Sequence, residues 1–324
     1  MTKAKVVFIH GIAPKLADVI ASHTPDNMTT VVVERDASED EQVEAVKDAD
    51  FLVIYTPTFS DRVLRSATKA RLIQVLSAGY DRLNLPLMEE MGIPFANNGG
   101  ANSWAVSDHA VLLMLSLYRK LVISDRATRD GRWLEPIDGT NTFEMAGKLV
   151  GILGIGRIGK QVAKRVQGFD ARVQYYDKYP LPTETDDELN VSPVALDRLF
   201  QTSDIITCHT GLTSETRHIV SRDHIAMMKA GAVLINTSRG GVIDEPALIE
   251  ALKEGRLGGA GLDVFEQEPV DSKNPLLTMD NVVVTPHAAG TTWDTWFRRA
   301  EFAYENLSRV WRGEEALSIV RESS

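Results

Sequence analysis

Three polar residues in the second half of the chain follow short apolar runs and carry the side chains needed to handle a small carboxylic acid. Arg239 comes after Val-Leu-Ile-Asn-Thr-Ser, Glu268 after Leu-Asp-Val-Phe-Glu-Gln, and His287 after Val-Val-Val-Thr-Pro. A guanidinium presents a rigid planar fork that matches a carboxylate, and an imidazole transfers protons near neutral pH. Because ligands of open α/β sheets bind beyond the carboxyl ends of the strands, these positions indicate proton transfer on a small anionic molecule.

Each of these residues also admits a structural role. Arg239 could form an ion pair with an acid such as Asp244, and His287 could cap a turn. Glu268 could be a solvated loop residue beside Pro269, or it could orient the imidazole of His287. The residues by themselves leave these alternatives open.

A glycine motif in the middle of the chain predicts a dinucleotide site. An apolar run ends in Gly154-Ile-Gly156-Arg157-Ile158-Gly159 and passes directly into a helical pattern, and a second strand pattern then ends at Asp177. In such a βαβ unit the glycines allow a tight turn, close approach of a pyrophosphate and close packing of the helix, whose first N–H groups face the phosphates. An acid in the place of Asp177 binds the adenosine ribose hydroxyls and repels a 2′-phosphate, which favours NAD over NADP.

Composition sets the class of protein. A chain of 324 residues exceeds the usual size of one core, and a net charge of −10 argues against a nucleic-acid or anionic-membrane surface. The single cysteine, Cys208, excludes an internal disulfide and a thiolate metal cluster, and no histidine pair suggests a metal site. The sequence shows neither a signal peptide nor an apolar run long enough to span a membrane, so we expect a cytoplasmic protein.

Apolar runs alternate with helical patterns along the chain, which predicts parallel sheets with helices. Strands are expected at 6–9, 30–33, 51–55, 72–76 and 93–97, and a breaker cluster at 97–102 precedes a helix from Ser103 to about Leu121. Further strands at 204–209, 232–236, 260–264 and 282–285 complete a doubly wound sheet of six or seven strands with the glycine-motif unit. A last helix, from Thr292 to about Arg312, is expected to return to the first domain.

Taken together, four motifs resemble those of the D-isomer-specific 2-hydroxyacid dehydrogenases. They are Gly154-x-Gly156-Arg157-Ile158-Gly159, Asn236-Thr-Ser-Arg239-Gly-Gly, Gly261-Leu-Asp263-Val-Phe-x-x-Glu268-Pro269 and Thr285-Pro-His287. The resemblance implies a Rossmann NAD-binding domain, 103–291, inserted in a smaller flavodoxin-like α/β substrate domain made of 1–102 and 292–324.

The resemblance also implies a reaction and its residues. Hydride would pass between NAD and a small 2-hydroxy or 2-keto acid, with Arg239 binding the substrate, His287 giving or taking the proton and Glu268 supporting His287. The family loop that receives the substrate carboxylate matches Ala78, Gly79 and Tyr80. Cofactor contacts are expected from the glycine motif, the acid after it and three later strand ends: Gly154, Gly156, Arg157, Ile158, Gly159, Asp177, His209, Thr210, Thr237 and Asp263.

Two further expectations concern partners. The helix that begins at Ser103 is apolar on nearly every face, which indicates burial between domains or subunits and favours a homodimer formed through the nucleotide domain. An ordinary core helix is the alternative. The rival to an enzyme is an NADH-sensing scaffold like the C-terminal-binding-protein corepressors, which resemble this family and carry extra tails for their partners.

Overall fold

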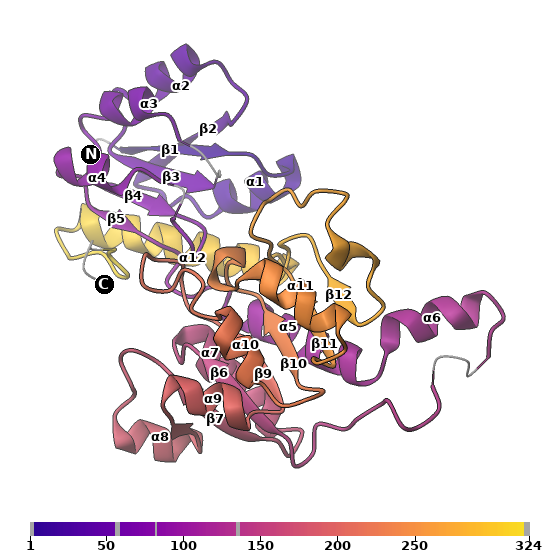
Figure 1. Ribbon diagram of the computed structural model, residues 1–324. Coiled ribbons are helices and arrows are strands. Elements are labelled where there is room, and N and C mark those ends of the chain that lie inside the picture. The colour runs from indigo at the N-terminus through magenta and orange to yellow at the C-terminus, as the bar shows by residue number, and fades with distance from the viewer. Residues whose placement is uncertain (1–2, 56–58, 82, 134–136, 321–324) are drawn as a thin grey trace. The chain divides into compact units, whose positions relative to one another are not determined.

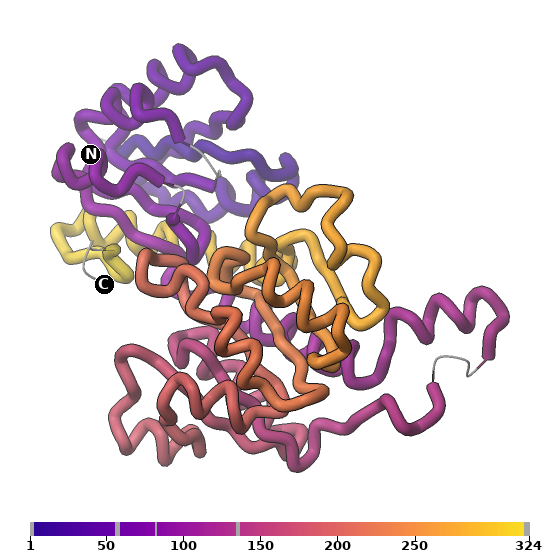
Figure 2. The backbone as a smooth tube through the Cα atoms, in the orientation of Figure 1, coloured from indigo at the N-terminus to yellow at the C-terminus, as the bar shows by residue number. Residues whose placement is uncertain are grey.

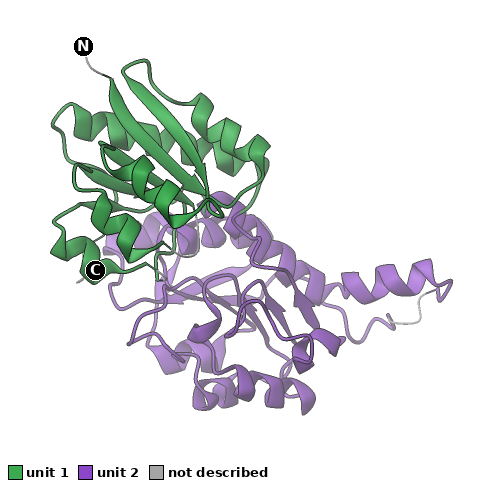
Figure 3. Ribbon diagram, turned by 90° about the horizontal axis from the view of Figure 1, so that it is seen from above, with its two compact units in different colours: residues 1–102, 291–324 green, residues 103–290 purple. Residues whose placement is uncertain are grey.

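The computed structural model describes residues 3–55, 59–81, 83–133 and 137–320. The chain divides into two compact units, residues 1–102 with 291–324 and residues 103–290 (Figure 3). Each unit is built on its own parallel sheet with helices on both faces, as predicted. We call them the split unit and the inserted unit.

The sheet of the split unit has five strands in the order β2-β1-β3-β4-β5 (Figure 1). The strands are β1 (Ala4–His10), β2 (Met28–Glu34), β3 (Phe51–Tyr55), β4 (Leu72–Val75) and β5 (Phe95–Ala96). The helices are α1 (Pro14–Ser22), α2 (Glu39–Val46), α3 (Asp61–Ser66), α4 (Leu85–Glu90) and α12 (Trp293–Trp311). Alternate residues of each strand therefore face two separate apolar cores, one beneath α1 and α12 and one beneath α2, α3 and α4.

Helix α12 completes the split unit from the far end of the chain. Its side chains Trp296, Ala300, Ala303 and Leu307 are buried in the same core as Phe8 and Phe51 of the sheet. A buried polar link accompanies this packing, because the Asn306 side chain donates a hydrogen bond of 2.8 Å to the Gln74 side chain on β4. Beyond the helix, Ile319 forms an antiparallel bridge with Ala96 of β5.

The inserted unit has a sheet of seven strands in the order β12-β11-β10-β9-β6-β7-β8. The strands are β6 (Leu149–Leu153), β7 (Arg172–Tyr176), β8 (Ser192–Pro193), β9 (Ile205–Cys208), β10 (Val233–Asn236), β11 (Gly259–Leu262) and β12 (Val282–Val284). The direction in which successive strands are added to the sheet reverses between β6 and β9. This is the switch point where doubly wound sheets bind their ligands. Two-residue β8 was not predicted from the sequence.

Helices cover both faces of this second sheet. They are α5 (Ser103–Tyr118), α6 (Leu121–Arg129), α7 (Arg157–Gln167), α8 (Thr183–Leu189), α9 (Leu196–Thr202), α10 (Arg222–Met227) and α11 (Glu245–Lys253), with short 3₁₀ turns η1 (Gly240–Val242) and η2 (Pro275–Thr278). One core contains residues of α5 and α7, and the other contains residues of α9, α10 and α11. Cys208 is fully buried in this second core, and burial raises its thiol pKa to about 12.

The predicted helix from Ser103 to about Leu121 is wrong in one respect. Helix α5 ends at Tyr118, and a new helix, α6, begins at Leu121. The chain turns because Lys120 adopts a left-handed conformation with φ of 50°. Helix α6 then extends away from the sheet of its unit (Figure 2).

None of the helices within the described residues combines the length and apolar character required to cross a membrane.

Candidate active site

The glycine motif forms the turn between β6 and α7, and the structure shows a different requirement at each glycine. Gly154 has φ of 96°, and a Cβ there would lie 2.9 Å from the backbone of His209. A Cβ on Gly159 would lie 2.2 Å from the Gly154 carbonyl oxygen, so only glycine lets α7 pack this closely. Gly156 faces open space and precedes a helix start without a side-chain cap, which leaves room and free N–H donors for a pyrophosphate.

Asp177 follows β7 and is fixed by backbone donors. Its carboxylate accepts hydrogen bonds of 2.9 Å from the N–H of Ile155, inside the glycine motif, and from the N–H of Tyr179. The neighbouring Lys178 is paired with Glu215 at 2.6 Å, and this hydrogen bond raises the pKa of the ammonium group. The lysine beside Asp177 is therefore held by a carboxylate from another loop.

His209 directly follows β9 and lies next to the glycine turn. Its Nε2 hydrogen-bonds the Thr207 hydroxyl at 2.8 Å, while its Nδ1 is buried and makes no hydrogen bond within the described part of the chain. Burial lowers the pKa of this ring to about 3, so it stays neutral at neutral pH. An orphaned ring nitrogen at the switch point fits a ligand contact, and together with the open space at Gly156 it makes this edge suitable for a dinucleotide.

Arg239 lies in a tight loop after β10 that Asn236 organises. The Asn236 side chain donates to the Arg239 carbonyl oxygen at 2.9 Å and accepts from the N–H and hydroxyl of Ser238. The guanidinium of Arg239 donates to the Ser238 carbonyl oxygen at 2.7 Å. Asp244, the alternative ion-pair partner considered from the sequence, caps α11 by accepting from the N–H of Ala247.

Gly240 allows the arginine loop to pack closely against the loop that follows β11. A Cβ on Gly240 would lie 1.9 Å from the carbonyl group of Phe265, so no larger residue fits. The arginine loop after β10 is thereby packed on the segment that leads from β11 to Glu268. The two loops hold their polar residues at the same edge of the sheet.

His287 and Glu268 are in direct contact. The Nδ1 atom of His287 lies 2.8 Å from Oε2 of Glu268, and the other glutamate oxygen accepts from the N–H of Phe265. The histidine side chain is 44% exposed and the glutamate side chain 17%, so the imidazole has an accessible edge. With Nδ1 engaged by the carboxylate, Nε2 is the atom left to exchange a proton with a ligand.

A second histidine and carboxylate lie near the same strand end. Asp263, which is 1% exposed, accepts hydrogen bonds from the Thr285 hydroxyl at 2.6 Å and from the N–H groups of Ala288 and Ala289. His109 of α5 contacts the same hydroxyl through Nε2 at 2.9 Å. Sequence reasoning did not include His109 or Thr285 in the site, although Thr285 belongs to the Thr-Pro-His motif.

Asp263 also positions His287. Its carbonyl oxygen accepts from the His287 N–H at 2.7 Å, and His287 has a left-handed φ of 54°. The aspartate carboxylate accepts hydrogen bonds from the two residues that follow the histidine. The backbone that carries the imidazole is therefore fixed both at His287 and directly after it. The structure therefore brings Glu268 and His287 together, and it places Arg239 after β10, two strands from β12.

The substrate loop expected at Ala78, Gly79 and Tyr80 follows β4 in the split unit. It is braced by a hydrogen bond of 2.7 Å from the Ser77 hydroxyl to the Gly79 carbonyl oxygen, and the Asn97 side chain donates to the Ala78 carbonyl oxygen at 3.4 Å. The Tyr80 ring packs edge-on against Phe95 with ring centroids 5.8 Å apart. The loop thus has a defined conformation at the carboxyl end of its sheet.

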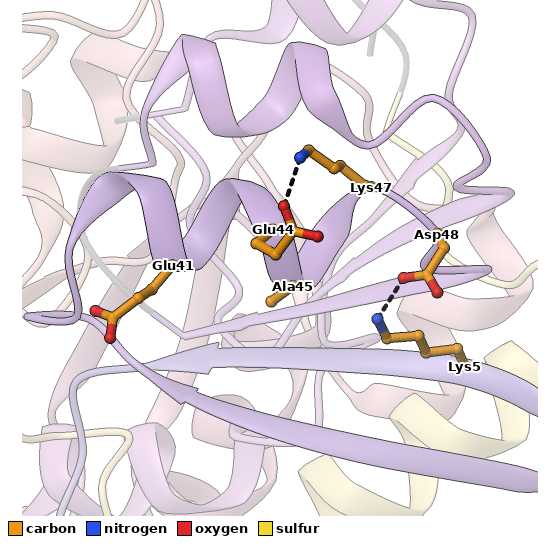
Figure 4. A pocket seen from close by; sticks show the side chains of 6 residues that line it. All are labelled: Lys5, Glu41, Glu44, Ala45, Lys47 and Asp48. Atoms are coloured by element: carbon orange, nitrogen blue, oxygen red, sulfur yellow. Dashed lines mark hydrogen bonds and ion pairs between the residues drawn. The ribbon is translucent and has the colours of Figure 1, made fainter.

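A hollow at the opposite edge of the split unit has none of these features. It is lined by Lys5, Glu41, Glu44, Ala45, Lys47 and Asp48, and Lys5 pairs with Asp48 while Lys47 pairs with Glu44 (Figure 4). These side chains satisfy one another at the solvent surface and lie near the amino ends of the strands. Among the described residues, no group of three or more His, Cys, Asp or Glu side chains is arranged to hold a metal ion.

Comparisons with known proteins agree with this geometry. Residues 111–289 match the family model described as the D-isomer specific 2-hydroxyacid dehydrogenase, NAD binding domain. A glyoxylate reductase of Korarchaeum cryptofilum is 39% identical over 284 residues, which cover 86% of this chain and 85% of that protein. A D-3-phosphoglycerate dehydrogenase of Methanocaldococcus jannaschii is 38% identical over 87% of this chain and 54% of its own length. The crystal structure of a glyoxylate reductase from Paecilomyes thermophila superposes with a TM-score of 0.85 at 28% identity and covers 100% of both chains.

The chain belongs to the D-isomer specific 2-hydroxyacid dehydrogenase family. It is an NAD-dependent oxidoreductase whose inserted unit is the family's Rossmann domain, which confirms the fold class and the cofactor predicted from the sequence.

Proposed function

We propose that the protein reduces a small 2-keto acid to the corresponding 2-hydroxy acid with NADH, and that glyoxylate is among its substrates. The observation that carries the proposal is the contact of 2.8 Å between His287 and Glu268 beside the arginine loop. Reduction of a ketone needs one proton at the oxygen, and this pair supplies a proton donor with a carboxylate behind it. The names of the glyoxylate reductase relatives support the choice of substrate.

Each residue then has a role. His287 holds the proton on Nε2 and delivers it to the carbonyl oxygen, while Glu268 stabilises the protonated ring and fixes its orientation. Arg239 binds the substrate carboxylate and the keto oxygen through two N–H groups, which aligns the reacting carbon. The loop of Ala78, Gly79 and Tyr80 receives the carboxylate through backbone N–H groups.

The cofactor binds at the carboxyl edge of the inserted unit's sheet, beside the glycine motif. The first turn of α7 with Arg157 and Ile158 would face the pyrophosphate, and Asp177 would bind the adenosine ribose. His209, Thr210, Thr237 and Asp263 would line the remainder of the site. When bound, NADH supplies the hydride; the protein binds, orients and protonates the substrate.

The decisive experiment follows NADH oxidation with glyoxylate, pyruvate and hydroxypyruvate in the parent and in Arg239→Lys. Lysine keeps the positive charge but loses the planar fork, so kcat/KM should fall by about 100-fold while the Kd for NADH stays within twofold. Turnover within twofold of the parent would mean that Arg239 is a structural residue. Failure of the parent to turn over any of these acids would refute the proposed reaction.

We also propose a homodimer formed through the inserted unit. Large apolar side chains of this unit are exposed in the single chain: Trp104, Leu112, Leu121, Val122 and Phe143. Leu121 and Val122 lie on α6, which extends away from its own sheet, and Phe143 lines one hollow with Val122; such a group of apolar side chains needs a covering surface. Sedimentation at micromolar concentration should give twice the chain mass of 35.7 kDa, and a mass of one chain would refute the dimer.

A further inference from the structure

Helix α5 packs closely along β11 because that strand is rich in glycine. A Cβ on Gly259 would lie 3.0 Å from the side chain of Leu117. A Cβ on Gly261 would lie 2.9 Å from that of Leu113. Four residues of a helix and two residues of a strand both span about 6–7 Å, so the two elements stay in step. The next helix residue in this row is His109, which therefore lies over the carboxyl end of the strand.

The third position of this row has a polar side chain where packing would accept an apolar one. His109 is 18% exposed, and its Nε2 lies 2.9 Å from the Thr285 hydroxyl and 3.8 Å from the carboxylate of Asp263. The hydroxyl gives its one proton to that carboxylate at 2.6 Å, so its oxygen accepts the Nε2 proton of His109. The hydrogen bonds therefore run in one direction, from His109 through Thr285 to Asp263.

The far end of this chain of hydrogen bonds is the backbone around His287. The Asp263 carboxylate accepts from the N–H groups of Ala288 and Ala289. The carbonyl oxygens of Asp263 and Thr285 accept from the N–H of His287 at 2.7 and 3.1 Å. His287 has a left-handed φ of 54°, which a residue other than glycine keeps only where its surroundings hold it. Because these hydrogen bonds end on backbone N–H groups, they act on the position of the imidazole.

We propose that His109 is a positioning residue for His287. By donating to the Thr285 oxygen it keeps the hydroxyl proton directed at Asp263, and Asp263 holds the left-handed segment from which the imidazole reaches the substrate. Hydrogen bonds in series strengthen one another, so loss of the first weakens the last. The proposal rests on the proposed function, because it assigns a support to the proton donor of that same site.

The first test compares two replacements of the histidine. His109→Gln places an amide NH₂ near the position of Nε2, whereas His109→Leu extends the apolar row and removes the donor. At saturating NADH, kcat for glyoxylate should fall about tenfold in the leucine variant, with KM within about twofold of the parent. The glutamine variant should lose no more than about threefold, because it keeps a donor. Equal kcat values in the two variants overturn the proposal.

His224→Leu is the matched control. His224 lies on α10 in the same unit, its side chain is 17% exposed, and it contacts the carboxylate of Asp197 at 3.3 Å. This variant should keep the parental kcat within about twofold even where its melting temperature falls, which separates a loss of stability from a loss of position. A decrease in kcat equal to that of His109→Leu overturns the proposal.

A double-mutant cycle tests whether His109 acts through the Thr285 hydroxyl. Thr285→Val removes the hydroxyl and keeps the branched shape. In that background His109→Leu should change kcat by less than about twofold, whereas independent effects would multiply. A double variant that shows the product of the two single losses overturns the proposal. If His109→Leu does not fold, His109→Asn, whose amide is too short to reach the hydroxyl, takes its place.

Hydrogen exchange gives a readout that needs no turnover. The N–H groups of Ala288 and Ala289 are bound to Asp263, so they should exchange about fivefold faster in His109→Leu than in the parent. In His109→Gln and His224→Leu they should stay within about twofold of the parental rate. Unchanged exchange in His109→Leu overturns the proposal even in an active protein. If the parent does not reduce glyoxylate but exchange responds as expected, the proposed function fails and the support of His287 stands.

Discussion

Two pairs of histidine and carboxylate lie near the strand end at Thr285–His287, and they differ in burial and in partners. Asp263 is enclosed and accepts hydrogen bonds from three groups, one of them the Thr285 hydroxyl that also contacts His109, whose Nε2 lies 3.8 Å from the aspartate. Glu268 touches His287 directly, and that imidazole is nearly half exposed. A carboxylate committed to backbone N–H groups fixes geometry, whereas one committed to an exposed imidazole can take part in proton transfer.

The comparison explains why two acids are needed at one strand end. Holding His287 in a left-handed conformation requires backbone hydrogen bonds, which Asp263 supplies. Stabilising a protonated ring requires a carboxylate in contact with it, which is the position of Glu268. Within the described part of the chain, the structure records no contact between Asp263 and the His287 ring, and the backbone N–H bound by Glu268 belongs to Phe265 rather than to the histidine segment.

Breaking the exposed pair at the histidine should have the largest effect. His287→Asn removes the proton donor but keeps a residue that tolerates left-handed backbone, so kcat/KM for glyoxylate should fall by about 10²- to 10⁴-fold. The matched variant His109→Gln removes the partly buried histidine, whose ring contacts Thr285, and should cost less than about tenfold. Equal losses in the two variants would erase the distinction between the pairs.

Replacing the buried acid should damage stability first. Asp263→Asn sets an amide NH₂ against N–H donors of Ala288 or Ala289, and a buried donor without an acceptor costs about 1–3 kcal/mol. Urea unfolding should show this decrease in the free energy of unfolding, while the exposed variant Asp187→Asn should stay within about 0.5 kcal/mol of the parent. Undiminished stability with lost turnover would make Asp263 a residue of the reaction itself.

Glu268→Gln tests whether the carboxylate of the exposed pair stabilises the protonated His287. The protonated imidazole loses its counter-charge, so reduction should weaken about tenfold and its alkaline limb should move to lower pH. Oxidation of the hydroxy acid needs the neutral ring, so its acidic limb should move in the same direction. The kcat/KM profiles in both directions measure this, and unmoved limbs would leave Glu268 as a loop carboxylate.

The exposed ion pair between Lys178 and Glu215 should give the smallest effect. The parent should prefer NAD to NADP at least tenfold in kcat/KM, or about 1.4 kcal/mol, because Asp177 repels a 2′-phosphate. Glu215→Gln releases Lys178 toward that phosphate, and NADP should gain about two- to fivefold relative to NAD. The double variant with Lys178→Ala should lose this gain; a gain that persists would assign it to the charge of Glu215 alone.

Much of this arrangement could be predicted from the sequence. Apolar runs are strong signals for buried parallel strands, and a polar residue just after such a run falls at the ligand edge by geometry alone. This is how Arg239, Glu268 and His287 were selected, and the contact between Glu268 and His287 agrees with that reasoning. The family match confirmed the fold and the cofactor.

The features that could not be predicted from the sequence depend on backbone conformation and on contacts between residues far apart in the chain. The end of α5 was misplaced because Arg119 and Lys120 are ordinary helix formers, and only the left-handed turn at Lys120 stops the helix. The backbone-binding role of Asp263 was not predicted, because no pattern indicates that its carboxylate faces N–H groups more than twenty residues away. The hydrogen bond between Arg299 and Tyr55 joins residues from opposite ends of the chain and leaves no periodic signal.

The split connectivity determines the order in which the protein can be completed during synthesis. The inserted unit is continuous in sequence, so its core can form as soon as residues 103–290 have left the ribosome. The first unit must wait, because Gln74 lacks its buried partner Asn306 and the face over Phe8 and Phe51 lacks α12 until the last residues are made. A nascent chain therefore exposes one apolar face of its first sheet throughout elongation, and this stage is where we expect chaperones to bind.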